Sequence, residues 1–355
     1  MIELHVWGTD SSISIISPEC VASAWLLRLC CFPQEIPFQV VPSSNTNLAD
    51  SNKLPVMIIR ESPRSSIVGK YEGYLHIVEY ISKEIVPKGR EIGLEFILDT
   101  YLADSLLQLA NKGLLSYLEN SLSIINEFNL FINNNNYEGY TRKLFQNYLP
   151  FPMMYNEPLK LSQLAKANCE SKGLYSSTNF LGFRSFKDVP QTEHFNVEAT
   201  EEQEADRVAL SGLHERQLMS KVKKRQLYHE SSQSLNCLIE TENYMDKIIS
   251  LFELLGNLNH QLNIFSKDDT KANLFCSSEL LLYALLYCMC HHDIPDKFIF
   301  DYINVKYTEI TKKLFFKASY LNNLLYTTPN IFRKPRGSEV PSLWNEIKYL
   351  SGYVL

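Results

Sequence analysis

The spacing of apolar residues changes character once along the chain, and this change constrains the fold more than any other feature. Residues 1–90 alternate between short strand patterns and longer helical patterns, whereas from residue 93 onward the apolar spacing is helical and no convincing strand follows. We therefore predict an α/β N-terminal thioredoxin-like domain, a small mixed sheet with helices on its faces, followed by an all-α C-terminal domain.

Boundary signals place the elements of the first part. Ser17-Pro18-Glu19 predicts a helix start, with Ser as N-cap, Pro at the first position and an acid in the first turn; the helix should run to Cys31. Pro55 begins a strand after a polar loop, which makes it a candidate structural cis-proline. The other patterns predict strands at 3–7, 38–41, 55–59 and 66–69 and a helix at 73–85.

The second part divides by composition as well as by periodicity. We predict a thioredoxin-like domain over 1–90, the first part of an all-helical domain over 91–172, a mobile polar and acidic insertion over 173–205, and the remainder of the helical domain over 206–355. The helices are expected at 94–132, 137–148, 159–172, 205–229, 235–255, 277–290, 296–325 and 343–350.

Composition excludes several classes of protein. The chain of 355 residues is 45% hydrophobic and 21% charged, as in folded soluble proteins, and its net charge of −6 disfavours nucleic acid as a partner. Its best apolar run, 280–290, has eleven residues, whereas a spanning helix needs about 20, so we expect a buried core helix there. The N-terminus does not resemble a secretory signal. The eight cysteines, without a CxxC pair, predict reduced, buried thiols of a chain exposed to the cytosol.

Two charged or metal-capable segments have competing interpretations. The segment 288–293 offers Cys and His side chains, but no second ligand pair lies nearby, so we expect the end of a buried helix and no metal site. The basic run at Lys221, Lys223, Lys224 and Arg225 could bind phosphate or anionic lipid. The sequence alone favours a solvated helix face that balances the five acids of 198–206.

The most unusual stretch is 136–155, where six aromatic residues lie close together and two prolines flank Phe151. It could be an aromatic helix of the core followed by a turn, which composition alone favours. It could instead be a contact surface, because aromatic and Arg residues are enriched in protein interfaces. The candidate interface residues are Tyr137, Tyr140, Arg142, Lys143, Phe145, Phe151, Met153 and Met154.

These features together resemble a known family. The first strand, the Ser17-Pro18 helix, Leu54-Pro55 and the all-α second half are similar to the glutathione-transferase fold. Three motifs are more specific and resemble the metaxin family, particularly its fungal metaxin-1-like members. They are Leu4-His5-Val6-Trp7-Gly8, Ser44-Asn45-Thr46-Asn47 ahead of Lys53-Leu54-Pro55, and the Asn-Tyr, Thr-Arg-Lys and Pro-Phe-Pro elements of 136–152. The similarity is good over 1–172, weak over 173–270 and moderate around 277–296.

The resemblance implies a non-enzymatic peripheral subunit of the sorting and assembly machinery (SAM complex), on the cytosolic face of the mitochondrial outer membrane. Its partners would be the β-barrel core subunit, a second transferase-like subunit and β-barrel precursor proteins, with a link to the TOM translocase. No catalytic residue, cofactor or metal is implied. The alternatives are a glutathione-dependent transferase and a soluble transferase-like scaffold with other partners.

The residues expected for transferase chemistry are replaced. The first strand ends in Trp7-Gly8 where a thiolate-activating residue would be expected, and Ser17 is explained by helix capping. Gly73-Tyr74 stands where transferases hold the glutamyl group with a polar pair, and Glu72 is one position away. We therefore expect binding through surfaces, with 137–154 as the main candidate.

Overall fold

The computed structural model describes residues 1–61, 66–85, 105–176, 201–258 and 275–351. As predicted, an N-terminal small mixed sheet with helices precedes a helical region, a layout compatible with a transferase-like arrangement. Among the described helices, none combines the length and the apolar character that crossing a membrane would require. The predicted domain limits near 90 and at 173–205 touch segments outside the described residues, so this division stays a prediction.

The sheet has four strands: β1 (Ile2–Val6), β4 (Phe38–Pro42), β5 (Val56–Arg60) and β6 (Ile67–Glu72). Their spatial order is β4-β1-β5-β6, with β1 parallel to β4 and antiparallel to β5, and β6 antiparallel to β5. All five residues of β1 are buried, as expected for a central strand. The four strand predictions are therefore confirmed, with no strand end more than three residues from its predicted place.

A small hairpin after β1 was not predicted. It consists of β2 (Gly8–Thr9) and β3 (Ser12–Ile13). Gly8 has φ of +156°, and a Cβ atom there would lie 2.0 Å from the carbonyl oxygen of Ser12. Only glycine permits this close approach of two backbone segments. Two-residue strands have too little periodicity to be recognised in a sequence.

The helix α1 (Pro18–Cys31) begins where the sequence predicts, and the Ser17 side chain caps it by accepting a hydrogen bond from the amide of Cys20. This helix is buried almost all round because it contacts the sheet on one side and α10 (Ser277–Met289) on another. The helix α2 (Gly73–Tyr80) continues as a π-helix, η3 (Ile81–Ile85). The Leu54–Pro55 peptide bond is cis.

Helices make up almost all of the described remainder of the chain. The predicted core helix at 280–290 is confirmed, because α10 is buried along its length. Short 3-10 turns are η1 (Phe32–Gln34), η2 (Thr46–Leu48) and η10 (Gly337–Glu339). The other helices are α4 (Ser105–Glu119), α5 (Leu122–Glu127), η6 (Phe128–Ile132), α6 (Asn134–Asn136), η7 (Tyr137–Thr141), α7 (Arg142–Tyr148), α8 (Met153–Ser171), α9 (Glu201–Leu258), α11 (Phe298–Lys306), α12 (Thr308–Tyr326) and α13 (Leu343–Leu350).

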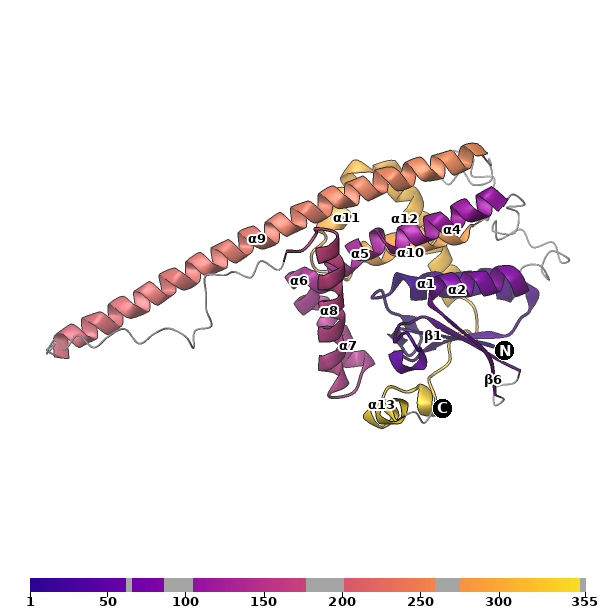
Figure 1. The fold of residues 1–355 in the computed structure, drawn as a ribbon, viewed down its shortest axis with the longest axis horizontal. Helices are drawn as coiled ribbons and strands as arrows, with labels where there is room; N and C mark the ends of the chain where they lie inside the picture. Colours follow the sequence, from indigo (N-terminus) through magenta and orange to yellow (C-terminus); the bar gives the residue numbers. More distant parts are fainter. Residues whose placement is uncertain (62–65, 86–104, 177–200, 259–274, 352–355) are drawn as a thin grey trace.

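Three helix predictions need correction. The helix expected at 159–172 begins already at Met153 and contains Pro158. The expected helices at 205–229 and 235–255 are one helix, α9, which projects from the body as a long arm (Figure 1). The serines between them do not end the helix: Ser231 donates its hydroxyl hydrogen bond to the carbonyl of Leu227, four residues back. Conversely, the expected helix at 296–325 is broken at Tyr307 into α11 and α12.

The chain returns to the sheet after α12. The amide of Val40 donates to the carbonyl of Ile331 at 2.7 Å, and the amide of Arg333 donates to the carbonyl of Val40 at 2.9 Å. Phe332 thereby forms a parallel bridge to the edge strand β4. A segment more than 290 residues away in sequence thus covers this edge, which would otherwise leave backbone groups unpaired.

Candidate partner-binding surface

A buried asparagine anchors the start of the aromatic segment. Asn136 donates from Nδ2 to Oδ1 of Asn129 at 2.9 Å and to the carbonyl of Asp296 at 3.2 Å. Its Oδ1 accepts a hydrogen bond from the Asp296 amide at 2.7 Å. Asn133 caps α6 and also bonds the Asp296 carboxylate at 2.9 Å. The run of four asparagines at 133–136 therefore joins the segment to the turn after α10.

One side of the segment faces the core. Thr141 is fully buried and donates its hydroxyl hydrogen bond to the carbonyl of Leu130 at 2.7 Å. Phe145 is also fully buried and meets Trp7 edge-on, with ring centroids 5.5 Å apart. The placement of Phe145 among the interface candidates is therefore wrong for this conformation, because its ring fills the space beside the end of β1.

The other side of the segment faces solvent. Arg142 and Lys143 are both exposed, and Arg142 pairs with Glu138 one turn earlier at 3.0 Å. Phe151 is 72% exposed, and the Phe151–Pro152 peptide bond is cis. A large apolar side chain this exposed loses favourable burial unless a partner covers it.

The remaining candidates lie between these extremes. Tyr137, Tyr140, Met153 and Met154 are partly buried and pack against the core. Burial raises the pKa of Tyr140 well above that of a free tyrosine, so its hydroxyl stays protonated. Both interpretations of the segment thus describe part of it. That its outer side contacts a partner stays a prediction.

Two further residues extend the exposed apolar area beyond the predicted segment. Tyr155 is 40% exposed with its ring centroid 6.2 Å from that of Phe151, and Leu159 is 56% exposed. Tyr155 and Leu159 are four residues apart on α8, which places them on one side of that helix, and this spacing could have been found in the sequence. Phe151 lies in the turn just before α8. We call Arg142, Lys143, Phe151, Tyr155 and Leu159 the Phe151 surface.

The positions that would bind glutathione in a transferase have structural partners here. The Glu72 carboxylate accepts hydrogen bonds from the amides of Asp50 and Ser51, at 2.7 and 3.0 Å, and pairs with Lys70 at 3.0 Å. Tyr74 is fully buried and donates to the carbonyl of Ser277 at 2.8 Å. These contacts already occupy the Glu72 carboxylate and the Tyr74 hydroxyl.

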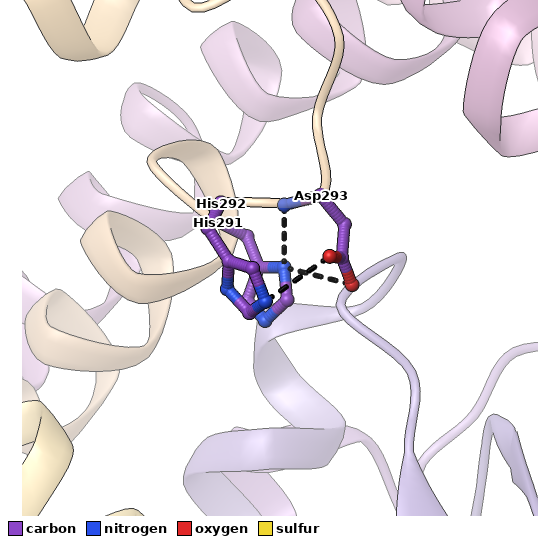
Figure 2. Close-up of side chains that lie close together, drawn as sticks. All are labelled: His291, His292 and Asp293. Atoms are coloured by element: carbon purple, nitrogen blue, oxygen red, sulfur yellow. Dashed lines mark hydrogen bonds and ion pairs between the residues drawn. The ribbon is translucent and has the colours of Figure 1, made fainter.

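A second cluster lies at the end of α10, where Figure 2 shows His291, His292 and Asp293. The Asp293 amide donates to Nδ1 of His291 at 3.3 Å, and Nε2 of His292 lies 3.1 Å from the Asp293 carboxylate. Burial lowers the pKa of His291, followed by the neighbouring His292, while Asp293 raises it. The three donor atoms are fewer than the four of a structural zinc site, and one lone pair already accepts a backbone hydrogen bond. The absence of a metal site remains a prediction.

A third group joins the sheet to the C-terminal segment. Glu3, His5 and Glu339 lie within 4.8 Å of one another at their ligand-type atoms. Arg333 pairs with Glu3 at 3.0 Å and with Glu339 at 2.8 Å, while Arg60 pairs with Glu3 at 3.0 Å. Two guanidinium groups thus neutralise the carboxylates that a cation would need. This group of ion pairs, formed by Glu3, Arg60, Arg333 and Glu339, links distant parts of the chain, and we call it the clasp.

Two family models match the chain. The Tom37 model, described as an outer mitochondrial membrane transport complex protein, matches residues 20–162 and contains the whole aromatic segment. The model of the Tom37 C-terminal domain matches residues 191–354, which include α9 to α13. No curated protein matches the chain.

Proposed function

The chain belongs to the metaxin-like Tom37 family, and from this premise we propose that it is a non-enzymatic, partner-binding subunit of an outer mitochondrial membrane transport complex. The Phe151 surface is the observation that carries the binding role. It combines two cations with three exposed apolar side chains on a framework held by buried Asn136, Thr141 and Phe145. A rigid aromatic anchor of this kind is typical of protein interfaces.

The finer assignment follows from the resemblance to fungal metaxin-1-like proteins. The complex would be the SAM complex, with this subunit attached peripherally on the cytosolic face. The Phe151 surface would contact either the β-barrel core subunit or the second transferase-like subunit during assembly of β-barrel precursor proteins. A link to the TOM translocase belongs to the same proposal. The fold would be that of a glutathione transferase, used as a scaffold.

A mild-detergent purification of the tagged full chain from mitochondria tests this proposal. Co-elution of an outer-membrane β-barrel protein and a second transferase-like chain is the expected result. A protein that stays soluble and elutes alone would contradict membership of the complex and favour the soluble scaffold.

Substitutions then test the surface itself. Phe151→Ser should release at least one co-eluting chain, because the anchor ring is lost while the core is untouched. Phe316→Ser is the matched control, since Phe316 on α12 is 75% exposed and lies outside the Phe151 surface. Arg142→Glu with Lys143→Glu should weaken assembly in the same way. Equal co-elution for the Phe151 and Phe316 variants would remove the interface.

The alternative of a glutathione-dependent transferase needs a different assay. Retention on immobilised glutathione, or turnover of a chlorinated aromatic substrate, would support it. We expect neither, because Glu72 and Tyr74 already bond to other parts of the protein and a ligand without matching donors binds poorly.

A further inference from the structure

The basic run on α9 has a charge that contrasts with the rest of the chain. Residues 216–229 contain five Lys or Arg residues and no acid, although the whole chain has a net charge of −6. Among the ion pairs formed by described residues, none involves Lys221, Lys223 or Lys224, all of which are exposed. These three lysines therefore present positive charge to solvent that no ion pair among the described residues neutralises.

Position 206, the last acid of 198–206, is too distant along α9 to balance this charge, although Glu215 lies nearer, six residues before Lys221. Positions 206 and 221 belong to the same helix, and fifteen residues correspond to a separation of about 22 Å along its axis. That is more than two screening lengths, each about 8 Å, at physiological ionic strength. The acids whose helix positions are described, within 201–206, are therefore too far along α9 to balance the basic run.

Exposed apolar side chains continue along the same side of the helix. With about 100° of rotation per residue, Lys221, Lys224, Tyr228, Leu235 and Ile239 fall within an arc of about 60°. Tyr228 is 65% exposed, Leu235 58% and Ile239 49%. We call these five residues the α9 stripe. It spans about 27 Å, from two lysines at one end to two aliphatic residues at the other.

Most of the α9 stripe points away from the side of α9 that packs on the body, while Leu235 lies at the rim of a hollow that α9 forms with Asn133 and Phe298. Buried Gln233, Cys237 and Thr241 face the other way by the same rotation. Beyond residue 239, α11 covers the continuation of the stripe, where Glu242 pairs with Lys306. The α9 stripe thus lies on a helix side that α11 contacts farther along the chain.

We propose that the α9 stripe binds the headgroup region of an anionic lipid bilayer. A straight helix with lysines beside tyrosine and aliphatic side chains matches a flat, negatively charged surface, where the rings and methyl groups enter the boundary with the acyl chains. Protein interfaces are depleted in lysine relative to arginine, which favours lipid over an acidic protein. This contact is additional to the Phe151 surface and does not depend on which proteins bind there.

Flotation of the purified full chain with lipid vesicles tests the proposal. The wild-type protein should float with vesicles containing phosphatidylinositol and much less with vesicles of phosphatidylcholine alone, and added salt should weaken the binding. Lys221→Glu with Lys224→Glu should reduce the affinity about tenfold or more. Tyr228→Ser with Leu235→Ser should also reduce it, through lost insertion.

The matched control changes the net charge by the same amount, but at positions outside the α9 stripe. Lys223→Glu with Lys247→Glu alters two exposed lysines of the same helix that lie outside the 60° arc, and it should retain most of the binding. Circular dichroism and the melting temperature check that each variant folds. If Lys221→Glu with Lys224→Glu does not fold, Lys221→Gln with Lys224→Gln takes its place.

Three results would overturn the proposal. One is equal flotation, or none, of the wild-type protein with the two kinds of vesicle. Another is an equal loss in the stripe and control variants, which would indicate a general charge effect. The third is a stripe variant that still floats but loses a protein co-eluting from mitochondria, which would assign the stripe to an acidic protein partner. Phe151→Ser should leave flotation with vesicles unchanged even where it releases a protein partner. The lipid-binding proposal and the partner-binding proposal can therefore be contradicted independently of each other.

Discussion

Arg333 donates from Nη2 to Oε1 of Glu3 at 3.0 Å, across 330 residues of sequence. The same guanidinium pairs with both carboxylate oxygens of Glu339, at 2.8 and 2.9 Å. Both side chains of the Arg333–Glu3 pair are at least nine-tenths buried. The pair attaches the segment after α12 to the central strand of the sheet, so the two ends of the chain stabilise one another.

Arg333→Ala should strongly destabilise the protein. The substitution leaves Glu3 with Arg60 alone and leaves Glu339 without its guanidinium partner. Removing one member of a buried charge pair costs about 3–5 kcal/mol. Urea unfolding would measure this loss. Lys334→Ala is the control: Lys334 is 82% exposed and pairs with Asp10 on the surface, so its loss should cost less than about 1 kcal/mol. Equal effects of the two substitutions would contradict the clasp.

The stability of the protein should fall in mild acid because of His5. Burial lowers the pKa of His5 from 6.5 to about 4, with Arg333 and Arg60 adding to the effect against Glu339. The folded state therefore binds this proton only at lower pH than the unfolded state. Its contribution is fully present above pH 6.5 and is lost as the pH falls from 6.5 toward 4.

Between pH 7 and pH 5 the loss from His5 should be about 2 kcal/mol in the free energy of unfolding. His5→Asn removes the titrating group, so the difference in unfolding free energy between the two pH values should shrink in that variant. Urea titrations at both pH values measure this. An unchanged difference would show that other groups cause the acid sensitivity.

Substitution by alanine should lower the stability of the protein strongly at Phe145 and hardly at all at Phe151. Phe145→Ala should cost about 3–5 kcal/mol of stability, because it leaves a cavity against Trp7. Phe151→Ala should change stability by less than about 0.5 kcal/mol, because the ring is already 72% exposed. Thermal unfolding of both variants distinguishes them. A large loss for Phe151→Ala would place that ring in the core and remove the Phe151 surface.

Tyr74→Phe tests how the sheet is joined to the helical part. The variant keeps the ring but loses the hydrogen bond from the hydroxyl to the Ser277 carbonyl. The net loss of one intramolecular hydrogen bond typically costs about 0.5–1.5 kcal/mol. Denaturant unfolding should show this loss, while Tyr71→Phe, at a partly exposed position, should show little change. No difference between the two variants would mean that the Tyr74 bond does not couple the parts.

Local signals predicted most elements of the first part. The Ser17 cap and the proline after it mark the start of α1, and period-two patterns mark the four strands, because these features depend on neighbours in sequence. The sequence analysis missed the break at Tyr307 and the continuity of α9. Serine and threonine side chains near these places can either support a helix or end it, depending on their surroundings.

The candidate surface shows the same division. The residue types of the aromatic segment could be read from the sequence, and so could its family resemblance. Which side of the segment faces inward could not, because Phe145 and Phe151 are chemically identical and differ only in what packs against them. The continuation of the surface to Tyr155 and Leu159 carried a four-residue spacing that the sequence does display.

The sequence by itself determined the class of fold, the order of most of its elements and the family, since capping, periodicity and motifs act over a few residues. Tertiary structure alone decided that Arg333 pairs with Glu3 and that Tyr74 donates a hydrogen bond to α10. It also decided that Lys221 and Tyr228 are exposed on the same side of α9. Burial and charge pairing depend on segments hundreds of residues apart, and no local pattern specifies which of them meet.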